Sequence, residues 1–383
     1  MSKVYLSYNN IISSLGFDSK SVVNKIHEGV SGLTKIHDTS ILPNPFYSSL
    51  INSSDLEEAF SKVTLKKDYT RLEKMMITSL QDTITQSDIE VNNEKVGLII
   101  STTKGNIDAL DTNNAFPKNR SYLHELGNAL TTHFGFKNKA ITVSNACVSG
   151  VLAIAIAKRY IQQGAYDHVF VVGGDLVTEF ILSGFNSFQA LSEEPCKPYD
   201  KNRTGINIGE IASSTLITKD KTKLVLEAVE ILGEGSCNDA NHISGPSRTG
   251  EGLYRSIQSA MTQANVSHQD IDYISAHGTA TMYNDEMEAI AFNRHHLENV
   301  PVNSLKGYFG HTLGASGLVE AIIGAHSLYN NTLYPSLGFE DIGVTQPINI
   351  ITKTTPQPLH TFLKTASGFG GCNTAVIFKK HIH

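Results

Sequence analysis

Short apolar runs alternate with amphipathic stretches along most of the chain. Apolar runs rich in valine and isoleucine, bounded by glycine, asparagine or charged residues, are typical of buried strands and occur at 94–102, 140–145, 167–175, 222–232, 270–278 and 373–380. Apolar residues at helical spacing predict helices over 68–86, 121–136, 251–265 and 285–295. The alternation predicts an α/β fold whose sheets are covered by helices, with a long irregular loop at 192–205.

Two apolar segments resemble each other. "SGVLAIAIA" begins at Ser149 and "SGLVEAIIG" at Ser316; each would open a buried helix after a strand, a glycine-containing turn and a reactive side chain, Cys147 or His311. The likeness arises either by chance or from an internal duplication. If the chain is duplicated, the halves meet near 219–223, and the two helices pack together with a site at their N-termini.

Composition excludes several classes of protein. The 383 residues are 40% hydrophobic and 18% charged with a net charge of −6, so no general attraction to nucleic acid or anionic membranes is expected. The four cysteines form no CxxC pair, which argues against a disulfide framework or a zinc knuckle. Neither a signal peptide nor an apolar stretch of about 18 residues is seen, so we expect a cytoplasmic protein.

Cys147 stands where a polar strand end meets the apolar helix, in "SNACVSGVLAIAIAKRY". It is either a small buried hydrophobe or a nucleophile in an exposed elbow. In the second case, the helix dipole and the backbone N–H groups would favour a thiolate or an oxyanion.

Two histidines stand in similar places. His277 follows an apolar strand and precedes Thr279 and Thr281, so it is either a loop histidine or part of a hydrogen-bonding slot for a long polar arm. His311 lies between two glycines, five residues after Lys306. Lys306 and His311 could together bind an anion or an enolate, or the segment is a simple turn with a solvent-facing lysine.

Glu320 is the only charge in the second apolar helix, and it either reaches solvent or pairs inside with Lys306. Phe369, in "SGFGGCN", is either part of a tight turn or a bulky side chain free to move over a bare backbone that a ligand can approach. A GxGxxG motif after a strand and a Walker A run are both missing, which argues against nucleotide binding.

Together these stretches resemble the β-ketoacyl-acyl carrier protein synthases of the elongating type, in the thiolase superfamily. The motifs occur in the family's order from about residue 94 to residue 380: "NACVSG", "PYDKNRTGINIGE", "AHGTATMYNDEME", "KGYFGHTLGASG" and "SGFGGCN". The resemblance implies a duplicated five-layer αβαβα fold, with a half at 1–220 that carries the nucleophile and a half at 221–383 that carries the histidines. It also implies a homodimer, or a heterodimer with a homologous chain-length factor.

The chemistry implied by the resemblance is a decarboxylating Claisen condensation. Cys147 would hold the acyl chain as a thioester, and His277 and His311 would stabilise the enolate formed from malonyl-carrier protein. The backbone N–H groups of Cys147 and Phe369 would bind the oxyanion. Acyl carrier protein is the implied partner and brings the phosphopantetheine arm; no metal or other cofactor is implied.

The resemblance gives other residues supporting roles. Lys306 and Glu320 match a supporting charged pair, Phe369 matches a gating aromatic, and Thr279 and Thr281 match a pair that contacts the phosphopantetheine arm. Cys372 replaces a threonine of the family, and we interpret it as structural. For an acidic carrier protein, candidate docking cations are Lys66, Lys67, Arg71 and Lys74, which otherwise form an ordinary solvated face.

The pathway and two other classes stay open. The first 95 residues are untypical of housekeeping fatty-acid enzymes, and "STTKGNID" (101–108) and "HGTATMYND" are more similar to synthases of aryl-polyene or flexirubin pigments. A chain-length-factor-like partner without catalysis is one alternative, but such chains typically lack the nucleophile. A thiolase is the other, and the two-histidine pattern argues against it.

Overall fold

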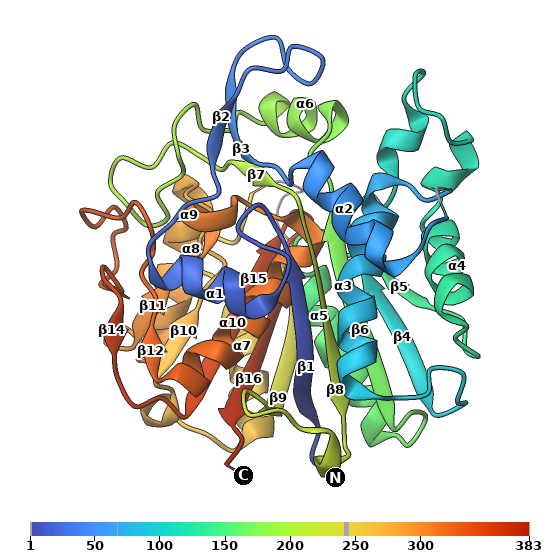
Figure 1. Ribbon diagram of the computed structural model, residues 1–383. Helices are drawn as coiled ribbons and strands as arrows, with labels where there is room; N and C mark the ends of the chain where they lie inside the picture. Colours follow the sequence, from blue (N-terminus) through green and yellow to red (C-terminus); the bar gives the residue numbers. More distant parts are fainter. Residues whose placement is uncertain (1, 67, 241–244, 383) are drawn as a thin grey trace.

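An eleven-stranded sheet runs through the molecule in a computed structural model that describes residues 2–66, 68–240 and 245–382 (Figure 1). Its strands, in spatial order, are β13 (Asn349–Ile350), β11 (Pro301–Asn303), β10 (Tyr273–Ser275), β15 (Thr361–Gly368), β16 (Cys372–Lys380), β9 (Val229–Asn238), β1 (Tyr5–Ile12), β8 (Ile211–Thr218), β6 (His168–Asp175), β4 (Val96–Ser101) and β5 (Ile141–Val143).

The strand order repeats itself. Five strands of the first half, β1, β4, β5, β6 and β8, match five strands of the second half, β9, β10, β11, β15 and β16, taken in chain order. Each strand lies at the same place in its half of the sheet as the strand that it matches. The two sets meet at the antiparallel pair β1–β9, through Tyr5↔Glu230 and Leu6↔Val229. The predicted duplicated fold is confirmed. The proposed boundary after residue 220 falls between β8 and β9 and stays a prediction.

Helices supply the other layers. α5 (Ser149–Gln162) and α10 (Ser316–Asn330) contact each other between the two half-sheets, while α3 (Arg71–Ser87) covers β1, β8 and β6 and α7 (Glu251–Ala264) covers β9 and β16. The central helices approach closely because each carries a glycine. A Cβ added at Gly150 would lie 2.6 Å from the backbone nitrogen of Leu318. The predicted packing of these two helices is confirmed.

The remaining elements surround this core. They are α1 (Ser19–His27), α2 (Ser53–Val63), α4 (Leu123–Phe134), α6 (Glu179–Ser187), α8 (Met282–Arg294), α9 (Lys306–Phe309), a small sheet of β2 (Thr34–Ile36), β3 (Phe46–Ser49) and β7 (Ile208–Gly209), and the pair β12 (Thr332–Leu333) and β14 (Thr355–Pro356). Within the described ranges, every helix is too short or too polar to cross a membrane.

Most predicted elements form within a few residues of their predicted bounds. The strand expected at 222–232 is wrong in its first half, because the Asp220 side chain accepts a hydrogen bond from the Thr222 N–H and a 3₁₀ turn forms there. The helix expected from residue 68 begins at Arg71, since Thr70 and Glu73 form a capping box. The loop at 192–205 is irregular, as predicted.

Candidate active site

Cys147 lies in the turn between β5 and α5. Ala146 before it has φ of 45°, a left-handed conformation that is uncommon for alanine. The Ser149 hydroxyl holds this turn, because it accepts from the Asn145 N–H at 2.8 Å and donates to the Ala146 carbonyl at 2.6 Å. The predicted turn at a helix N-terminus is therefore present.

The thiol is buried rather than exposed. Cys147 is 8% exposed, so the expected exposed elbow is wrong. Burial, with a smaller contribution from Cys372, raises the pKa of the Cys147 thiol to about 12. The resting residue is therefore a neutral thiol, and its proton has to leave as the sulfur reacts.

His311 is held by one hydrogen bond at its backbone and one at its ring. It follows α9, its N–H donates to the Asn207 carbonyl at 2.7 Å, and its Nδ1 accepts from the Leu313 N–H at 3.2 Å. Because Nδ1 accepts, the neutral ring carries its proton on Nε2. This Nε2 is buried and has no hydrogen-bond partner among the described residues, so it is free to donate to a ligand.

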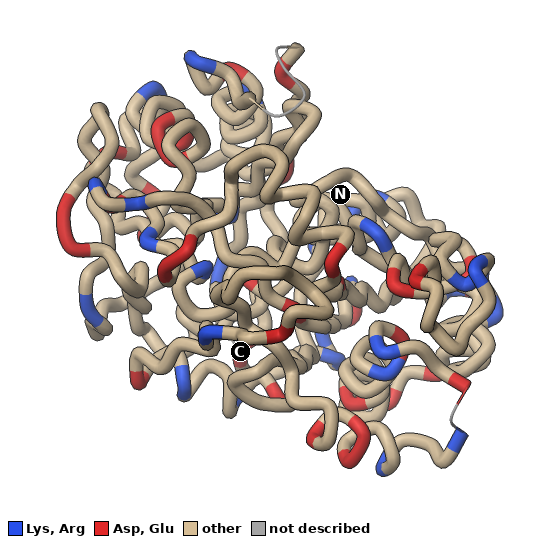
Figure 2. The backbone as a smooth tube through the Cα atoms, turned by 90° about the horizontal axis from the view of Figure 1, so that it is seen from above, with Lys and Arg blue, Asp and Glu red and all other residues tan. Residues whose placement is uncertain are grey.

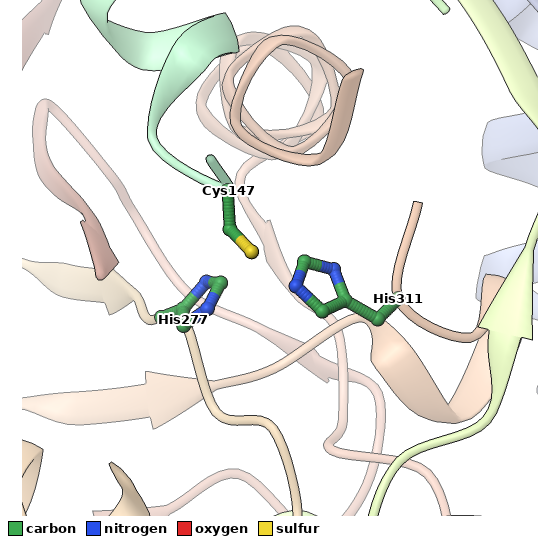
Figure 3. Close-up of side chains that lie close together, drawn as sticks. All are labelled: Cys147, His277 and His311. Carbon is green, nitrogen blue, oxygen red and sulfur yellow. The ribbon is translucent and has the colours of Figure 1, made fainter. Parts of the chain in front are cut away.

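His277 follows β10 and faces His311 across Cys147 (Figure 3). The two imidazole rings lie 5.1 Å apart at 80°, and one ligating atom from each ring and the Cys147 sulfur lie within 4.8 Å of one another. Lys306 Nζ lies 3.5 Å from His277 Nδ1, so the neutral ring of His277 too carries its proton on Nε2. The structure therefore brings together the three residues predicted to carry the chemistry.

The environment keeps both rings neutral. Burial, and then the positive charge of Lys306, lower the pKa of His277 and of His311 well below the usual value. A metal ion would bind the Nε2 lone pairs, so the proton of each imidazole would have to move to Nδ1. There the proton of His311 would oppose the Leu313 N–H, and the proton of His277 would oppose the Lys306 ammonium. The cluster therefore fits two hydrogen-bond donors better than a metal site.

Glu320 pairs inside the protein. Its Oε1 lies 2.9 Å from Lys306 Nζ, and the side chains of Lys306 and Glu320 are 1% and 3% exposed, so the alternatives of a solvent-facing lysine and a solvent-facing glutamate are wrong. A second lysine that the sequence interpretation missed, Lys364, lies 2.6 Å from the other carboxylate oxygen. Although burial opposes it, the two lysines hold the pKa of Glu320 below its ordinary value.

Two carboxylates that the sequence interpretation also missed hold the backbone after β10. Glu288 accepts from the N–H groups of His277 at 2.8 Å and Gly278 at 2.6 Å, and Asp285 accepts from the Thr279 N–H at 2.9 Å. Both acids are fully buried on α8. Their signal in the sequence is a pair of acids three apart on a helix that follows a histidine.

A cavity of about 340 Å³ opens above the three central residues. Its lining includes Thr279 and Thr281, whose hydroxyls lie 2.8 Å apart, as expected for a hydrogen-bonding slot. Phe369 stands at this cavity, 37% exposed, with its ring 5.7 Å from Phe185 and 5.4 Å from Phe188. Lys306 and Glu320 lie behind the histidines rather than in the lining.

The remaining predicted residues that the structure describes lie outside the cavity lining, although Cys372 lies beside the Cys147 turn. Cys372 is buried, with its sulfur 3.4 Å from the Phe369 carbonyl and 3.7 Å from that of Asn145. Among the candidate docking cations, Arg71 pairs with Glu210 and Lys74 with Glu57, whereas Lys67 lies outside the described residues. Acidic and basic segments are interspersed around the face seen in Figure 2.

Comparison with known families covers most of the chain. Residues 13–222 match the beta-ketoacyl synthase N-terminal domain, and residues 228–340 match the beta-ketoacyl synthase C-terminal domain.

Two relatives are both named 3-oxoacyl-[acyl-carrier-protein] synthase 2. One, from Rhizobium meliloti, is 35% identical over 63% of this chain and 60% of its own length. The other, from Vibrio cholerae, is 28% identical over 99% of each chain. The alignment with the first relative thus spans less than two thirds of that protein.

Solved structures share the fold. A ketosynthase in complex with its chain length factor from Xenorhabdus doucetiae is 25% identical, with a TM-score of 0.88 over 99% of this chain and 98% of that chain. The ishigamide ketosynthase/chain length factor is 22% identical, with a TM-score of 0.90 over the whole of both chains. The thiolase-like arrangement expected from the sequence is confirmed.

Proposed function

Because the chain belongs to the beta-ketoacyl synthase family, a family of acyltransferases, we propose that it is a 3-oxoacyl-acyl carrier protein synthase. It would condense malonyl-carrier protein with an acyl chain held on Cys147. The observation that carries this proposal is the meeting of one thiol and two imidazole Nε2–H groups at the floor of one cavity. The names of the relatives agree with it.

In the first half-reaction, Cys147 takes the acyl group. The sulfur attacks the thioester carbonyl of the acyl-carrier protein, a new C–S bond forms, and the bond to the phosphopantetheine sulfur breaks. The proton of the neutral Cys147 thiol ends on the departing phosphopantetheine thiolate. We expect the backbone N–H groups of Cys147 and Phe369 to bind the oxyanion between these steps.

In the second half-reaction, the two histidines act as donors. The thioester oxygen of malonyl-carrier protein would lie between the Nε2–H groups of His277 and His311, which stabilise the enolate as carbon dioxide leaves. The enolate carbon then attacks the acyl-cysteine carbonyl, so a C–C bond forms, the C–S bond to Cys147 breaks, and the departing thiolate takes a proton from solvent. No electrons are transferred to or from an external acceptor, and the phosphopantetheine arm is part of the substrate.

Partner, pathway and location extend this proposal. A homodimer and a heterodimer with a chain-length factor both agree with the family, and two similar structures pair a ketosynthase with a chain length factor. The retained Cys147 argues against this chain being the non-catalytic member. The motif at 101–108 favours an aryl-polyene or flexirubin pathway over housekeeping fatty-acid synthesis, and the expected location is the cytoplasm.

Acylation of Cys147 is the test. The protein would be incubated with carrier proteins that hold short saturated, long saturated or polyunsaturated aryl chains, and intact and peptide mass spectrometry would locate the acyl group. We expect label on Cys147 and none on Cys147→Ala. Preference for aryl or polyene chains supports the pigment pathway, and preference for saturated chains supports fatty-acid synthesis. No label from any donor, with or without a partner subunit, contradicts the enzymatic role.

A further inference from the structure

Lys364 is a fully buried lysine on β15 that the proposed reaction does not use directly. It pairs in register with Ser275 of the parallel strand β10. Its Nζ donates to the carbonyls of Ser275 at 3.0 Å and Ala276 at 3.1 Å, and lies 2.6 Å from Glu320 Oε2. The lysine therefore holds the two residues that immediately precede His277.

Lys306 binds the next backbone carbonyl along the chain in the same way. It donates to the His277 carbonyl and pairs with Glu320 Oε1 at 2.9 Å. Three consecutive carbonyls, 275–277, thus accept from two ammonium groups, while the three N–H groups of 277–279 donate to Glu288 and Asp285. The backbone of this segment (275–279), which we call the His277 segment, is bound on both sides by charged side chains.

The charges within the cluster of Lys306, Glu320 and Lys364 do not cancel. Lys306 and Glu320 alone would form a neutral pair, and Lys364 adds a second buried cation to the same carboxylate. Lys364 makes the smallest of the contributions that lower the pKa of both histidines, after burial and Lys306 and, for His277, after His311. The charged and titratable groups around His277 and its backbone are Lys306 from α9, Lys364 from β15, Glu320 from α10, Glu288 and Asp285 from α8, Arg203 beside Asp285, His311 and Cys147.

A stability role alone does not account for this arrangement. Burying a second ammonium is costly, and a buried ion pair is often matched in stability by apolar residues of similar volume. A cation added behind two neutral donors, however, favours an anion at their Nε2–H side.

We propose that Lys364 is a positioning residue of this synthase. Together with Lys306 it fixes the His277 segment, and it adds a second buried cation behind the imidazoles so that they stay neutral and stabilise the enolate. The inference rests on the proposed function, since it assigns Lys364 to the decarboxylating half-reaction.

Two substitutions at Lys364 distinguish the effect of its charge from the effect of its hydrogen bonds. Lys364→Met removes both, whereas Lys364→Gln keeps an amide that can donate to the Ser275 and Ala276 carbonyls. Lys158→Met is the matched control, because Lys158 is also buried, at 4% exposure, and donates to a single carbonyl, that of Leu232 at 3.1 Å, from the C-terminal part of α5. Melting temperatures confirm which variants fold.

The first readout does not need activity. Proteins labelled with ¹³C-histidine are titrated by NMR, with His277→Asn and His311→Asn used to assign the two imidazoles. In Lys364→Gln, and in Lys364→Met if it folds, we expect both imidazole pKa values to rise by about half a pH unit or more, since a nearby cation is lost. Unchanged pKa values in a folded Lys364 variant overturn the proposal.

The second readout compares the half-reactions. Release of carbon dioxide from malonyl-carrier protein should slow about tenfold or more in both Lys364 variants, while acylation of Cys147 slows less and Lys158→Met keeps wild-type rates. A wild-type rate in Lys364→Gln contradicts the role of the charge. If the wild-type protein itself neither acylates nor decarboxylates, the proposed function fails, and the imidazole titration still decides the electrostatic role of Lys364.

Discussion

The two central helices, α5 and α10, begin alike and serve different chemistry. Both start with Ser-Gly after an irregular turn, and the glycines let the two backbones meet. At the fifth position, however, α5 carries the buried Ala153 and α10 carries the buried Glu320. The duplicated scaffold therefore places Cys147, the proposed nucleophile, before one helix, and His311, backed by charges, before the other.

Burial shifts the pKa of the Cys147 thiol and the pKa values of the two imidazoles in opposite directions. It raises the pKa of the Cys147 thiol and lowers the pKa of His277 and His311, so the thiol and both imidazoles are neutral at rest. The charged side chains Lys306, Glu320 and Lys364 lie one step behind them. The cavity thus favours anions that form during the reaction over a stored thiolate.

The largest expected effect comes from removing the proposed nucleophile, Cys147, because this should stop acylation while decarboxylation on the histidine side continues. We expect Cys147→Ala to lose acylation and to lower condensation by about a thousandfold or more, because the covalent step has no substitute. Release of carbon dioxide from malonyl-carrier protein should continue, since the α10 side is intact. Cys237→Ala, at a partly exposed cysteine, is the control and should react normally. Retained acylation of Cys147→Ala would place the nucleophile elsewhere.

Removing the charge on α10 tests the other side. Glu320→Ala leaves two buried lysines without their shared carboxylate, and we expect a loss of about 3–5 kcal/mol in the free energy of unfolding. Urea unfolding measures this loss. As a control, Glu58→Ala breaks the exposed pair with Lys62, where both side chains are at least 70% exposed, and should change stability little. Equal effects of the two variants would contradict the buried network.

Much of this comparison was predictable from sequence. The Ser-Gly starts, the order of the five motifs and the positions of Cys147, His277 and His311 indicated both the duplication and the centre of the site. These features are local, because each is a short run of residues around one turn. The pairing of Lys306 with Glu320 was one of two stated alternatives, since both residues lie in the same run around α9 and α10.

The charged residues around the His277 segment were not predictable in the same way. Lys364 reaches Ser275 only because β15 pairs with β10 in a particular register, and the sequence does not state that register. Glu288 lies on a helix whose orientation depends on packing against the sheet. Burial of Cys147 was one of two stated alternatives, and the sequence could not decide between them, because exposure of a turn depends on which other segments of the fold cover it.

The closeness of the two helices can be tested with one methyl group. In Gly317→Ala the new Cβ would lie 2.2 Å from Val151 Cγ2 and 2.8 Å from the Val151 nitrogen, so the helices have to separate. We expect a loss of about 1–3 kcal/mol in the free energy of unfolding. Gly184→Ala on α6 is the control, since its Cβ would meet no atom within 4 Å. A neutral Gly317→Ala would mean that the central layer is loosely packed.

The smallest expected effect is a pH dependence that belongs to the histidine side alone. Because the folded pKa values of His277 and His311 lie below the unfolded value of about 6.5, the unfolded chain binds more protons below that pH. The free energy of unfolding should therefore fall as pH drops below about 6.5, by up to about 1.4 kcal/mol per pH unit for each histidine.

The double variant His277→Asn/His311→Asn isolates this slope. Asp285, whose pKa burial raises to about 6, acts in the opposite direction, but it is present in both proteins and cancels in the difference. Urea unfolding at several values between pH 5 and pH 7 should give a flatter curve for the variant than for the wild type. Equal slopes would mean that the two imidazoles take up protons in the folded protein as readily as in the unfolded chain, and the cavity would then not be holding them neutral.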